Sequence, residues 1–415
     1  MLRKRKLVSA LTIILILSMV LMVGCGGNDT PAPTPDVPAT DDQSSNDSGT
    51  DAPDQSSEGP KYGGTYRTYT DSSFKTLDPA FATASLDGKI VALLYDALVQ
   101  FDTKGQIIPG LAESWELIDD STYQFKLVEN AKFHNGNPLT AADVKYSFER
   151  VLDPEVGSPR TWVFDKVMGA KKFNEGNATE VTGIEVIDEY TVKITLEEPF
   201  APFLSMLGMP AAHIVDKKEI ENYTDQKEYG LNPVGSGPFS IVVYDEGNKL
   251  LVKANEEYFA GRPYIDELEY RFIKDTSTQV AEFEAGNIDY LSIPVADLDR
   301  FRNNPQYSDS IINSNTFWNY YIGLTFDKEP LSDVRVRQAF QHAIDRTAII
   351  NVAKRNKAIL SNGPIPKGLD GYRDLPEPYP YNVEKAKELL KEAGYSESNP
   401  CKFELWHSES ESNVA

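Results

Sequence analysis

The sequence predicts an α/β protein with more than one hydrophobic core. Length is the first indication, because residues 61–415 form a stretch of globular composition that is too long for a single core. Hydrophobic periodicity is the second. Apolar side chains alternate with polar ones over 123–127 and 192–196, as in half-buried strands, whereas over 139–152 they form one helical face.

Two of the predicted elements carry local signals at their ends. A β-hairpin is expected over 241–255, where two apolar stretches flank the turn sequence EGN. The helix over 139–152 has a capping pattern, in which Thr140 precedes the helix and Asp143 follows three residues later. These signals fix where the two elements begin or turn.

Two further helices are expected in the last quarter of the chain. One covers VRVRQAFQHAIDRTAII (334–350). The other covers NVEKAKELLKEAG (382–394), where Asn382 is suited to cap the first turn and Gly394 to end the last one. We find no internal repeat.

The N-terminus reads as an export signal. A basic block at 3–6 precedes an apolar stretch over 7–23, and Cys25 follows it. The sequence LMVGC resembles the lipobox of bacterial lipoproteins, in which the cysteine is acylated and becomes the new N-terminus. We therefore expect a lipoprotein signal peptide over 1–25 with Cys25 as the site of lipid attachment. The alternative is an uncleaved anchor helix, and either arrangement exports the protein and holds it at a membrane.

Residues 26–60 form a tether in this interpretation. The segment consists largely of Pro, Ser, Thr, Asp and Gly, with eight acidic residues and no aromatic residue, Lys or Arg. Such a composition buries too little apolar surface to offset the entropy of ordering, so we expect it to be disordered. If Cys25 carries lipid, Cys401 has no disulfide partner within the chain.

The charge excludes one class of partner. The chain has 41 basic and 63 acidic residues, a net charge of −22. Nucleic-acid binding needs a basic surface, so we expect no nucleic-acid partner.

Motifs for catalysis or metal binding are absent from the sequence. The four histidines have no metal-ligand spacing, and HExxH, CxxC and GxSxG are missing. GSGPF (235–239) lacks the GK[ST] of a phosphate-binding loop, so it predicts a tight turn that enters a strand. We therefore expect no enzyme activity, no catalytic residue, no metal and no cofactor.

Aromatic residues favour a binding role. The chain contains 21 tyrosines, and WNYY (318–321) places large, polar-tipped rings next to one another. Such rings suit a site that holds ligands by stacking and a few hydrogen bonds, although we expect most of the aromatic residues simply to pack the sheets.

Several blocks in the same order resemble one protein family. The sequence is similar to the extracytoplasmic solute-binding proteins of bacterial ABC importers, family 5, which includes oligopeptide and dipeptide binders. The similar blocks are GGTYRTY (63–69), LDPA (77–80), LYDALVQFDTKGQIIPGLAESWEL (94–117), FKLVENAKFHNGNPLTAADVKYSFERVLDP (125–154), NPVGSGPFSI (232–241), NEEYFAGRPYIDELEYRFI (255–273), FEAGNIDYL (283–291), PLSDVRVRQAFQHAIDR (330–346) and YNVEKAKELLKEAGY (381–395).

The resemblance implies a two-lobed α/β fold of the periplasmic-binding-protein (venus-flytrap) type. We expect lobe I to contain 61–100 and 213–293, an extra subdomain (101–212) to be inserted in lobe I, and lobe II to cover 294–415. Members of this group continue past the helix that contains AGY, whereas the sequence ends shortly after it. The C-terminal part of lobe II is therefore expected to be missing.

The resemblance also implies a function and a ligand site. Family members bind a ligand between the lobes, close over it and deliver it to a membrane permease. We therefore expect a monomer that captures small peptides outside the cell and docks on an ABC permease complex. The positions that match ligand-contacting segments of the family, or lie just inside lobe II, are Thr83, Ser85, Trp162, Trp318, Tyr320 and Tyr321.

Other readings stay open at this point. A cello-oligosaccharide or a nickel chelate could replace the peptide as ligand. A surface receptor or adhesin could use the same fold without transport, and a tethered hydrolase would need a nucleophile and base that the sequence does not display.

Overall fold

The computed structural model describes residues 60–223, 226–314, 316–369 and 371–406. The predicted signal peptide with Cys25, and the tether up to residue 59, lie outside the described residues. His407 lies outside them as well.

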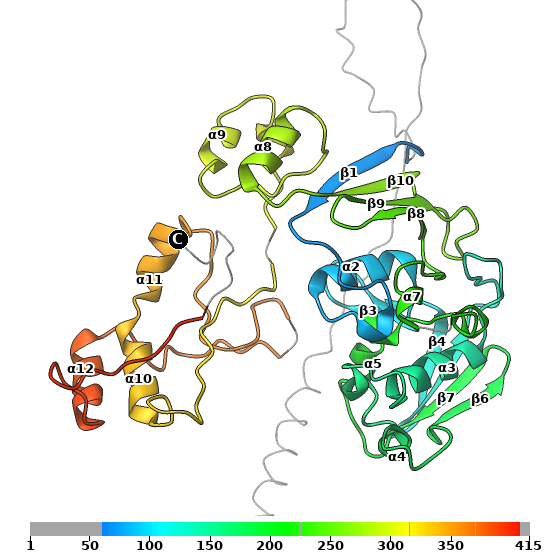
Figure 1. The fold of residues 1–415 in the computed structure, drawn as a ribbon, viewed down its shortest axis with the longest axis horizontal. Helices are drawn as coiled ribbons and strands as arrows, with labels where there is room; N and C mark the ends of the chain where they lie inside the picture. Colours follow the sequence, from blue (N-terminus) through cyan, green and yellow to red (C-terminus); the bar gives the residue numbers. More distant parts are fainter. Residues whose placement is uncertain (1–59, 224–225, 315, 370, 407–415) are drawn as a thin grey trace, which may run out of the picture. The chain divides into compact units, whose positions relative to one another are not determined.

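The first sheet joins strands from distant parts of the sequence. Its order is β1-β10-β9-β8 (Figure 1). β1 (Thr65–Thr70) is parallel to β10 (Glu267–Phe272), and β9 (Lys249–Ala254) and β8 (Phe239–Asp245) continue the sheet antiparallel. β8 and β9 form the predicted hairpin, which turns at Gly247 with φ 76°. That prediction is confirmed.

Helix α2 (Ser85–Leu94) shares a core with this sheet. Its apolar residues Ile90 and Val91 are fully buried in one cluster with Leu250 and Val252 of β9. The helix therefore fixes the loop that precedes it relative to the sheet.

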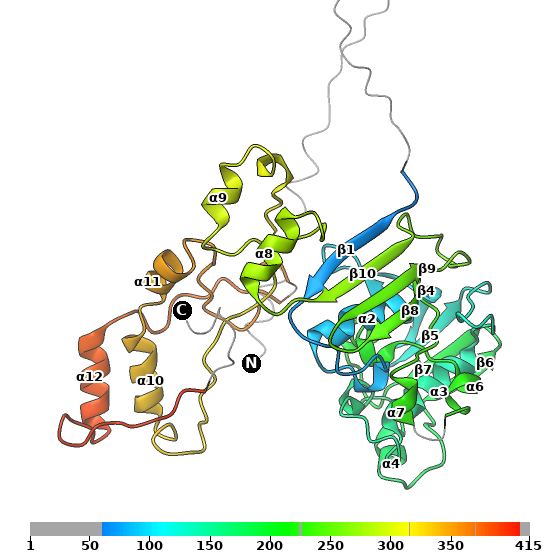
Figure 2. The ribbon, with the colours of Figure 1, turned by 45° about the horizontal axis from the view of Figure 1, so that its top comes forward.

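The second sheet is antiparallel throughout. Its order is β4-β5-β7-β6, formed by β4 (Ala112–Asp119), β5 (Thr122–Leu127), β7 (Thr191–Thr195) and β6 (Ile184–Asp188), as Figure 2 shows. The strands predicted from alternation coincide with β5 and β7, which are the two central strands of the sheet. Alternation is clearest there because one face of each central strand is buried.

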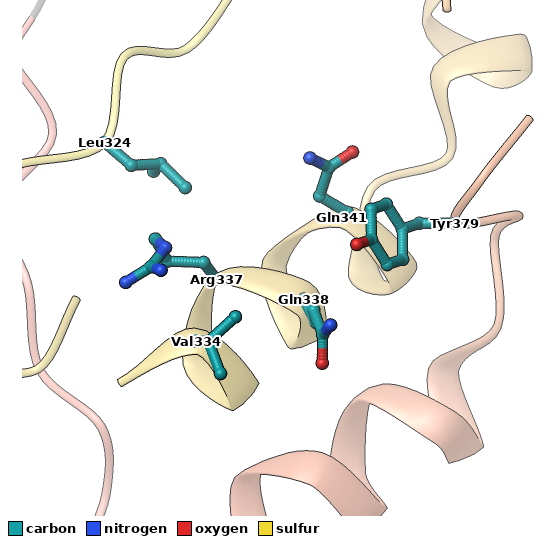
Figure 3. Close-up of a pocket in the computed structure, with 6 residues that line it drawn as sticks. All are labelled: Leu324, Val334, Arg337, Gln338, Gln341 and Tyr379. Carbon is teal, nitrogen blue, oxygen red and sulfur yellow. The ribbon is translucent and has the colours of Figure 1, made fainter. Parts of the chain in front are cut away.

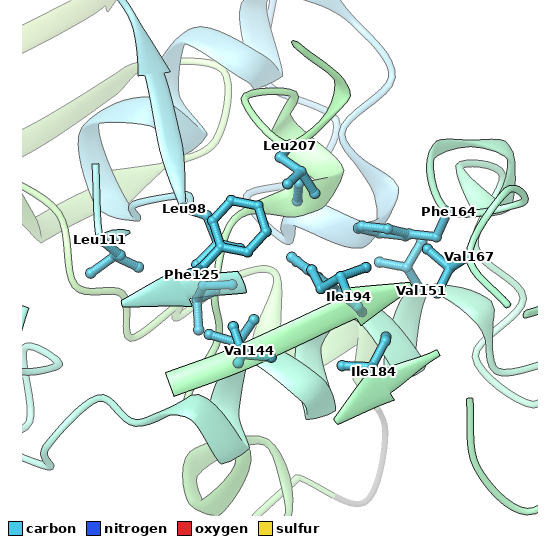
Figure 4. Close-up of a cluster of buried hydrophobic side chains, with 14 of the residues drawn as sticks. Leu98, Leu111, Phe125, Val144, Val151, Phe164, Val167, Ile184, Ile194 and Leu207 are labelled. Carbon is cyan, nitrogen blue, oxygen red and sulfur yellow. The ribbon is translucent and has the colours of Figure 1, made fainter. Parts of the chain in front are cut away.

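Helix α3 (Ala141–Leu152) packs on the second sheet. Its Val144 belongs to one buried cluster with Phe125 of β5 and Ile194 of β7 (Figure 4). Thr140 precedes the helix as predicted, and both its backbone N–H and its hydroxyl donate to the carboxylate of Asp143, each at 2.9 Å.

Two helices pack side by side in the C-terminal part of the described chain. They are α10 (Val334–Ala343) and α12 (Val383–Glu392) (Figures 1 and 2). The Asn382 side chain caps α12 by accepting from a backbone N–H at 2.9 Å, and Gly394 follows the helix at φ 91°. The predicted ends of this helix are confirmed. Its small core with α10 contains Ala339, Ala386 and Leu389.

The helix predicted over 334–350 is shorter than expected. α10 ends at Ala343, and Ile344 has an extended backbone (ψ 114°). The carboxylate of Asp345 accepts a hydrogen bond from the Ala348 N–H at 2.8 Å, so it caps a new short helix, α11 (Arg346–Ala348). A single π turn, η5 (Ile349–Ala353), follows. The prediction was wrong because an aspartate that caps the next helix competes with continuation of the first.

The other elements are short. They are η1 (Pro79–Phe81), β2 (Val99–Phe101), β3 (Ile107–Pro109), η2 (Thr161–Val163), α4 (Ala170–Asn174), α5 (Phe203–Met206), η3 (Pro210–Ala212), α6 (Lys217–Ile220), α7 (Gln226–Tyr229), α8 (Thr276–Glu284), α9 (Leu298–Arg302) and η4 (Ser308–Ser310). Within the part of the chain that the structure describes, no helix has the length and apolar character needed to cross a bilayer.

Candidate ligand-binding site

The segment that leads into α2 carries two predicted ligand residues, Thr83 and Ser85. It begins at Asp78, whose carboxylate accepts from the Ala80 N–H at 3.0 Å and so caps the short helix η1. Pro79 occupies the first position of that helix, where a missing N–H costs nothing. The local sequence DPA therefore determines the start of this segment.

A buried arginine from α3 holds Asp78 in place. The Arg150 Nη1 and Nη2 atoms donate to the two carboxylate oxygens of Asp78 at 2.9 and 2.6 Å. Both side chains are almost inaccessible, at 3% and 2% exposure. The guanidinium also lies 5.9 Å from the ring centre of Tyr229. A buried ion pair thus joins the segment that leads into α2 to helix α3, which packs on the second sheet.

The chain after α3 binds the same segment through its carbonyl groups. The Ser158 hydroxyl donates to the carbonyl of Ala80 at 2.6 Å. The Arg160 Nε donates to the carbonyl of Ala82 at 3.1 Å, and Nη2 donates to that of Thr83 at 3.0 Å. Three carbonyls of one short loop are therefore fixed by two side chains.

Trp162 lies beside this loop. It belongs to η2, its side chain is 43% exposed, and the Arg160 guanidinium carbon lies 5.9 Å from the centre of its ring. Arg160 consequently contacts both the Thr83 carbonyl and Trp162. Ser85, two residues beyond Thr83, is the exposed first residue of α2. The structure brings these three predicted ligand residues to one place.

The other three predicted ligand residues form a separate group. Trp318, Tyr320 and Tyr321 lie in a segment without helix or strand, with exposed fractions of 67%, 69% and 85%. The Lys354 ammonium lies 4.5 Å from the ring centre of Tyr320. Among the contacts of the described residues, none joins this group to Thr83, Ser85 or Trp162. The role of all six in binding stays a prediction.

A cavity of about 260 Å³ lies at α10 (Figure 3). Its lining is mixed, and none of the predicted ligand residues belongs to it. The guanidinium of Arg337 already donates to the carbonyls of Leu331 and Ser332. The volume is below the range of about 300–1,000 Å³ that ligand pockets usually have. The lining residues are Leu324, Val334, Arg337, Gln338, Gln341 and Tyr379.

A buried carboxyl group lies just after α2. Asp96 accepts hydrogen bonds from the Tyr258 hydroxyl at 2.7 Å and the Ser236 hydroxyl at 3.0 Å. Burial raises the pKa of Asp96 to about 6, against the lowering effect of these two donors. Ser236 belongs to GSGPF, which leads directly into β8 as predicted. GSGPF therefore has a structural role, in which Ser236 binds Asp96 and the turn leads into β8.

Two histidines also belong to the scaffold. His213 is buried, and burial lowers its pKa to about 4, although its Nδ1 donates to the Met209 carbonyl at 3.1 Å. The ring of His134 bridges the backbone of Gly235 and Gly237 at 3.3 and 3.0 Å, and burial lowers its pKa. In the described ranges, no three His, Cys, Asp or Glu side chains gather in a way that could hold a metal ion.

Three residues of this site were missed from the sequence. Arg150 lies within a helix whose polar face looks ordinary, and its partner Asp78 is 72 residues away, so no local pattern marks the pair. Ser158 and Arg160 lie in the sequence SPRTW, immediately before Trp162. An arginine next to a candidate ligand aromatic was the one signal that could have drawn attention to them.

Comparison with known proteins identifies the family. The family model for bacterial extracellular solute-binding proteins, family 5 (middle region), matches residues 106–414. The glutathione-binding protein GsiB of Pectobacterium atrosepticum is 32% identical over 346 residues, which cover 83% of this chain and 63% of that protein. Heme-binding protein A of Haemophilus influenzae is 34% identical over 330 residues, or 75% of this chain and 58% of that protein. The chain thus matches less than two thirds of the length of these relatives.

Solved structures agree with this assignment. OppA of Burkholderia pseudomallei has a TM-score of 0.73 and 28% identity, covering 82% of this chain and 69% of OppA. The murein tripeptide binding protein MppA of Escherichia coli also has a TM-score of 0.73, with 26% identity and coverage of 82% and 68%. These similarities confirm the predicted fold class, the two-lobed α/β fold of periplasmic binding proteins. The chain belongs to the bacterial extracellular solute-binding proteins of family 5.

Proposed function

We propose that this protein is the substrate-binding lipoprotein of an ABC importer and that it captures small peptides outside the cell. The observation that carries the proposal is the fixed loop at 80–83. Its carbonyls are held by Ser158 and Arg160, and Thr83, Ser85 and Trp162 lie exposed beside them. A rigid backbone segment next to an exposed indole suits a ligand that is part peptide and part apolar side chain.

The relatives support a peptide-like ligand. The proteins similar to this chain include a glutathione-binding protein, and glutathione is a tripeptide. They also include a murein tripeptide binding protein and a DppA of Helicobacter pylori in complex with the peptide STSA. We therefore infer peptides of two to a few residues as the ligand class.

The domain arrangement is proposed on the same basis. Strands of the first sheet come from 61–100 and 213–293, the proposed lobe I, while the second sheet lies within the proposed insert at 101–212. Residues 294–415 would belong to lobe II. The ligand would lie between the lobes, and closure would follow from tighter ligand contacts in the closed state.

Thermal unfolding of the full-length protein tests the ligand class. Peptides of two to six residues, glutathione, hemin, cello-oligosaccharides and a nickel chelate would be added separately. A ligand at a hundred times its dissociation constant stabilises a one-site binder by about 2.7 kcal/mol, which raises the unfolding temperature by a few degrees. We expect a shift with peptides or glutathione. A shift with sugar, hemin or nickel alone would contradict the peptide assignment.

The role of Trp162 is tested by substitution. Trp162→Ala removes the exposed ring beside the loop and is expected to weaken peptide binding about tenfold, the effect of losing one aromatic contact. Trp406→Ala is the control, because Trp406 is 87% exposed near the end of the described chain. Equal affinities of the two variants would remove Trp162 from the proposed site.

We propose further that Cys25 carries the lipid that anchors the protein as a monomer at the cell membrane, where it meets its permease. Cells grown with labelled palmitate should incorporate label into wild type and into Cys401→Ser. Cys25→Ser should lose both the label and the membrane association. Label that persists in Cys25→Ser would contradict this assignment, and membrane association that persists without label would favour an uncleaved anchor helix.

A further inference from the structure

Arg160 is a cation without a carboxylate partner. A guanidinium has five N–H donors in a planar fork. In the described part of the chain no Asp or Glu forms an ion pair with Arg160, whereas Arg67 pairs with Asp289 and Arg262 pairs with Glu256 and Asp266.

The two carbonyl contacts of Arg160 use only one edge of its fork. Nε donates to Ala82 and one hydrogen of Nη2 donates to Thr83, so the side edge formed by Nε and Nη2 is occupied. The end edge, formed by one hydrogen of Nη1 and the second hydrogen of Nη2, has no acceptor among the described residues. An end edge of this kind matches the two oxygens of a carboxylate.

The surroundings of that edge suit a ligand. Trp162 is partly exposed next to the guanidinium. Thr83, whose carbonyl accepts from Arg160, and Ser85 are exposed as well. The loop carbonyls already hold the guanidinium in place, so a carboxylate would meet a preorganised pair of donors. The Arg160 side chain would therefore lose little conformational entropy when the ligand binds. No carboxylate of the described residues neutralises this guanidinium, so its charge is available to an anionic ligand.

We propose that Arg160 binds a carboxylate of the ligand through this end edge, with the Trp162 ring covering the adjoining apolar part of the ligand. The inference rests on the proposed function, which supplies the peptide. Two sources carry the same chemistry, namely the C-terminal carboxylate of the peptide and an acidic side chain. Arg160 then determines specificity in addition to holding the loop.

The test compares matched peptides on the full-length protein by calorimetry. Ala-Ala-Ala with a free C-terminus is compared with its C-terminal amide, and Ala-Glu-Ala amide with Ala-Gln-Ala amide. Wild type should bind the carboxylate member of one pair about tenfold to a hundredfold more tightly, the range for a charge-assisted bidentate contact. The pair that shows the preference identifies the source of the carboxylate.

Three variants separate recognition from loop support. Arg160→Gln should bind both members of the preferred pair equally, whereas Arg160→Lys should retain part of the preference because it keeps the charge. Arg302→Gln is the control, since Arg302 is an exposed arginine at the end of α9 without an ion pair among the described residues. It should keep the full preference.

The failures are distinguishable. If Arg160→Gln weakens both members of a pair by the same factor, Arg160 supports only the loop and the inference is overturned. A wild type that binds peptides without preference for a carboxylate overturns it as well, while the proposed function stands. Wild type that binds no peptide overturns the proposed function together with this inference.

Discussion

The carboxylate of Asp78 and the guanidinium of Arg150 form a buried, doubly hydrogen-bonded pair, with distances of 2.9 and 2.6 Å. The two residues come from different parts of the fold, because Asp78 precedes η1 and Arg150 lies near the end of α3. The pair therefore connects the segment that carries Thr83 to the second sheet. It fixes where that segment begins.

Removing one member of this pair should be costly. Arg150→Met keeps much of the side-chain volume but leaves the Asp78 carboxylate buried without its counter-charge. We expect the free energy of unfolding to fall by about 3–5 kcal/mol, the usual cost of breaking a buried pair from one side. Urea unfolding followed by circular dichroism measures this loss. The peptide affinity of the folded fraction should fall too, because the loop loses its first anchor.

The matched control lies on the same helix. Lys145 pairs with Glu180 at 2.6 Å, but these side chains are 23% and 60% exposed. Lys145→Met should therefore cost about 0–1 kcal/mol. A loss for Arg150→Met no larger than that for Lys145→Met would mean that water reaches the Asp78 carboxylate in the folded protein.

The close approach of two backbone segments depends on Gly235 and Gly237. A Cβ added at Gly235 would lie 1.8 Å from the carbonyl oxygen of Leu94, at the end of α2. Gly235 cannot move away easily, because its N–H donates to the His134 ring and its carbonyl accepts from the His134 N–H at 2.7 Å. Gly235→Ala should destabilise the protein by about 3 kcal/mol or more.

The control for this substitution is Gly323→Ala. At Gly323 the nearest atom to an added Cβ is a Tyr321 ring carbon at 4.0 Å, and its φ is not positive. The free energy of unfolding of this variant should lie within about 1 kcal/mol of the wild-type value. Alanine restricts the unfolded chain, which acts toward a small increase in this free energy. Equal midpoints for the two variants would show that the α2 end and the 235 turn separate in solution.

The regular elements were predictable where one face is buried and the caps are local. β5, β7 and α12 follow directly from periods of two and 3.6 residues with polar caps. The helix over 334–350 failed because Asp345 can either continue one helix or cap the next, and the periodicity does not distinguish the two. The pairing of β1 with β10, about 200 residues apart, left no local signal.

The candidate site was predictable only in part. Thr83, Ser85 and Trp162 came from the family resemblance, and the structure places them together through Arg160. Arg160 itself acts through two backbone carbonyls, and carbonyls are present at every residue. The pattern of side chains in the sequence therefore does not predict hydrogen bonds to backbone carbonyls. The exposed Trp318 group was visible in the sequence as WNYY, but clustering along the chain does not say which other segment the rings meet.

His213 should make the protein less stable as the pH falls. Burial holds its folded-state pKa at about 4, while the unfolded chain takes up this proton near pH 6.5. The contribution is present above about pH 6.5 and is lost as the pH falls toward 4, by about 3 kcal/mol in total. His213→Asn should remove this dependence from urea unfolding curves measured between pH 4 and 7. If the free energy of unfolding has the same slope against pH in wild type and His213→Asn, the lowered pKa of His213 is contradicted. His342→Asn, a histidine substitution in the C-terminal part of the chain, is the control.

Asp96 should act in the opposite direction over nearly the same range. Its folded-state pKa is raised to about 6 by burial, while the unfolded carboxyl titrates near 3.8. Its contribution is therefore present below about pH 4 and is lost as the pH rises through 6, by about 3 kcal/mol.

In wild type the effects of Asp96 and His213 oppose each other between pH 4 and 6. Asp96→Asn keeps an acceptor for the Tyr258 hydroxyl but removes the titrating carboxyl. The effect of His213 on the free energy of unfolding is then unopposed, so this free energy should rise more steeply with pH than in wild type. His213→Asn should change the slope with the opposite sign. If the two variants change the slope in the same direction, then one of these groups is not buried in the protonation state that the structure implies.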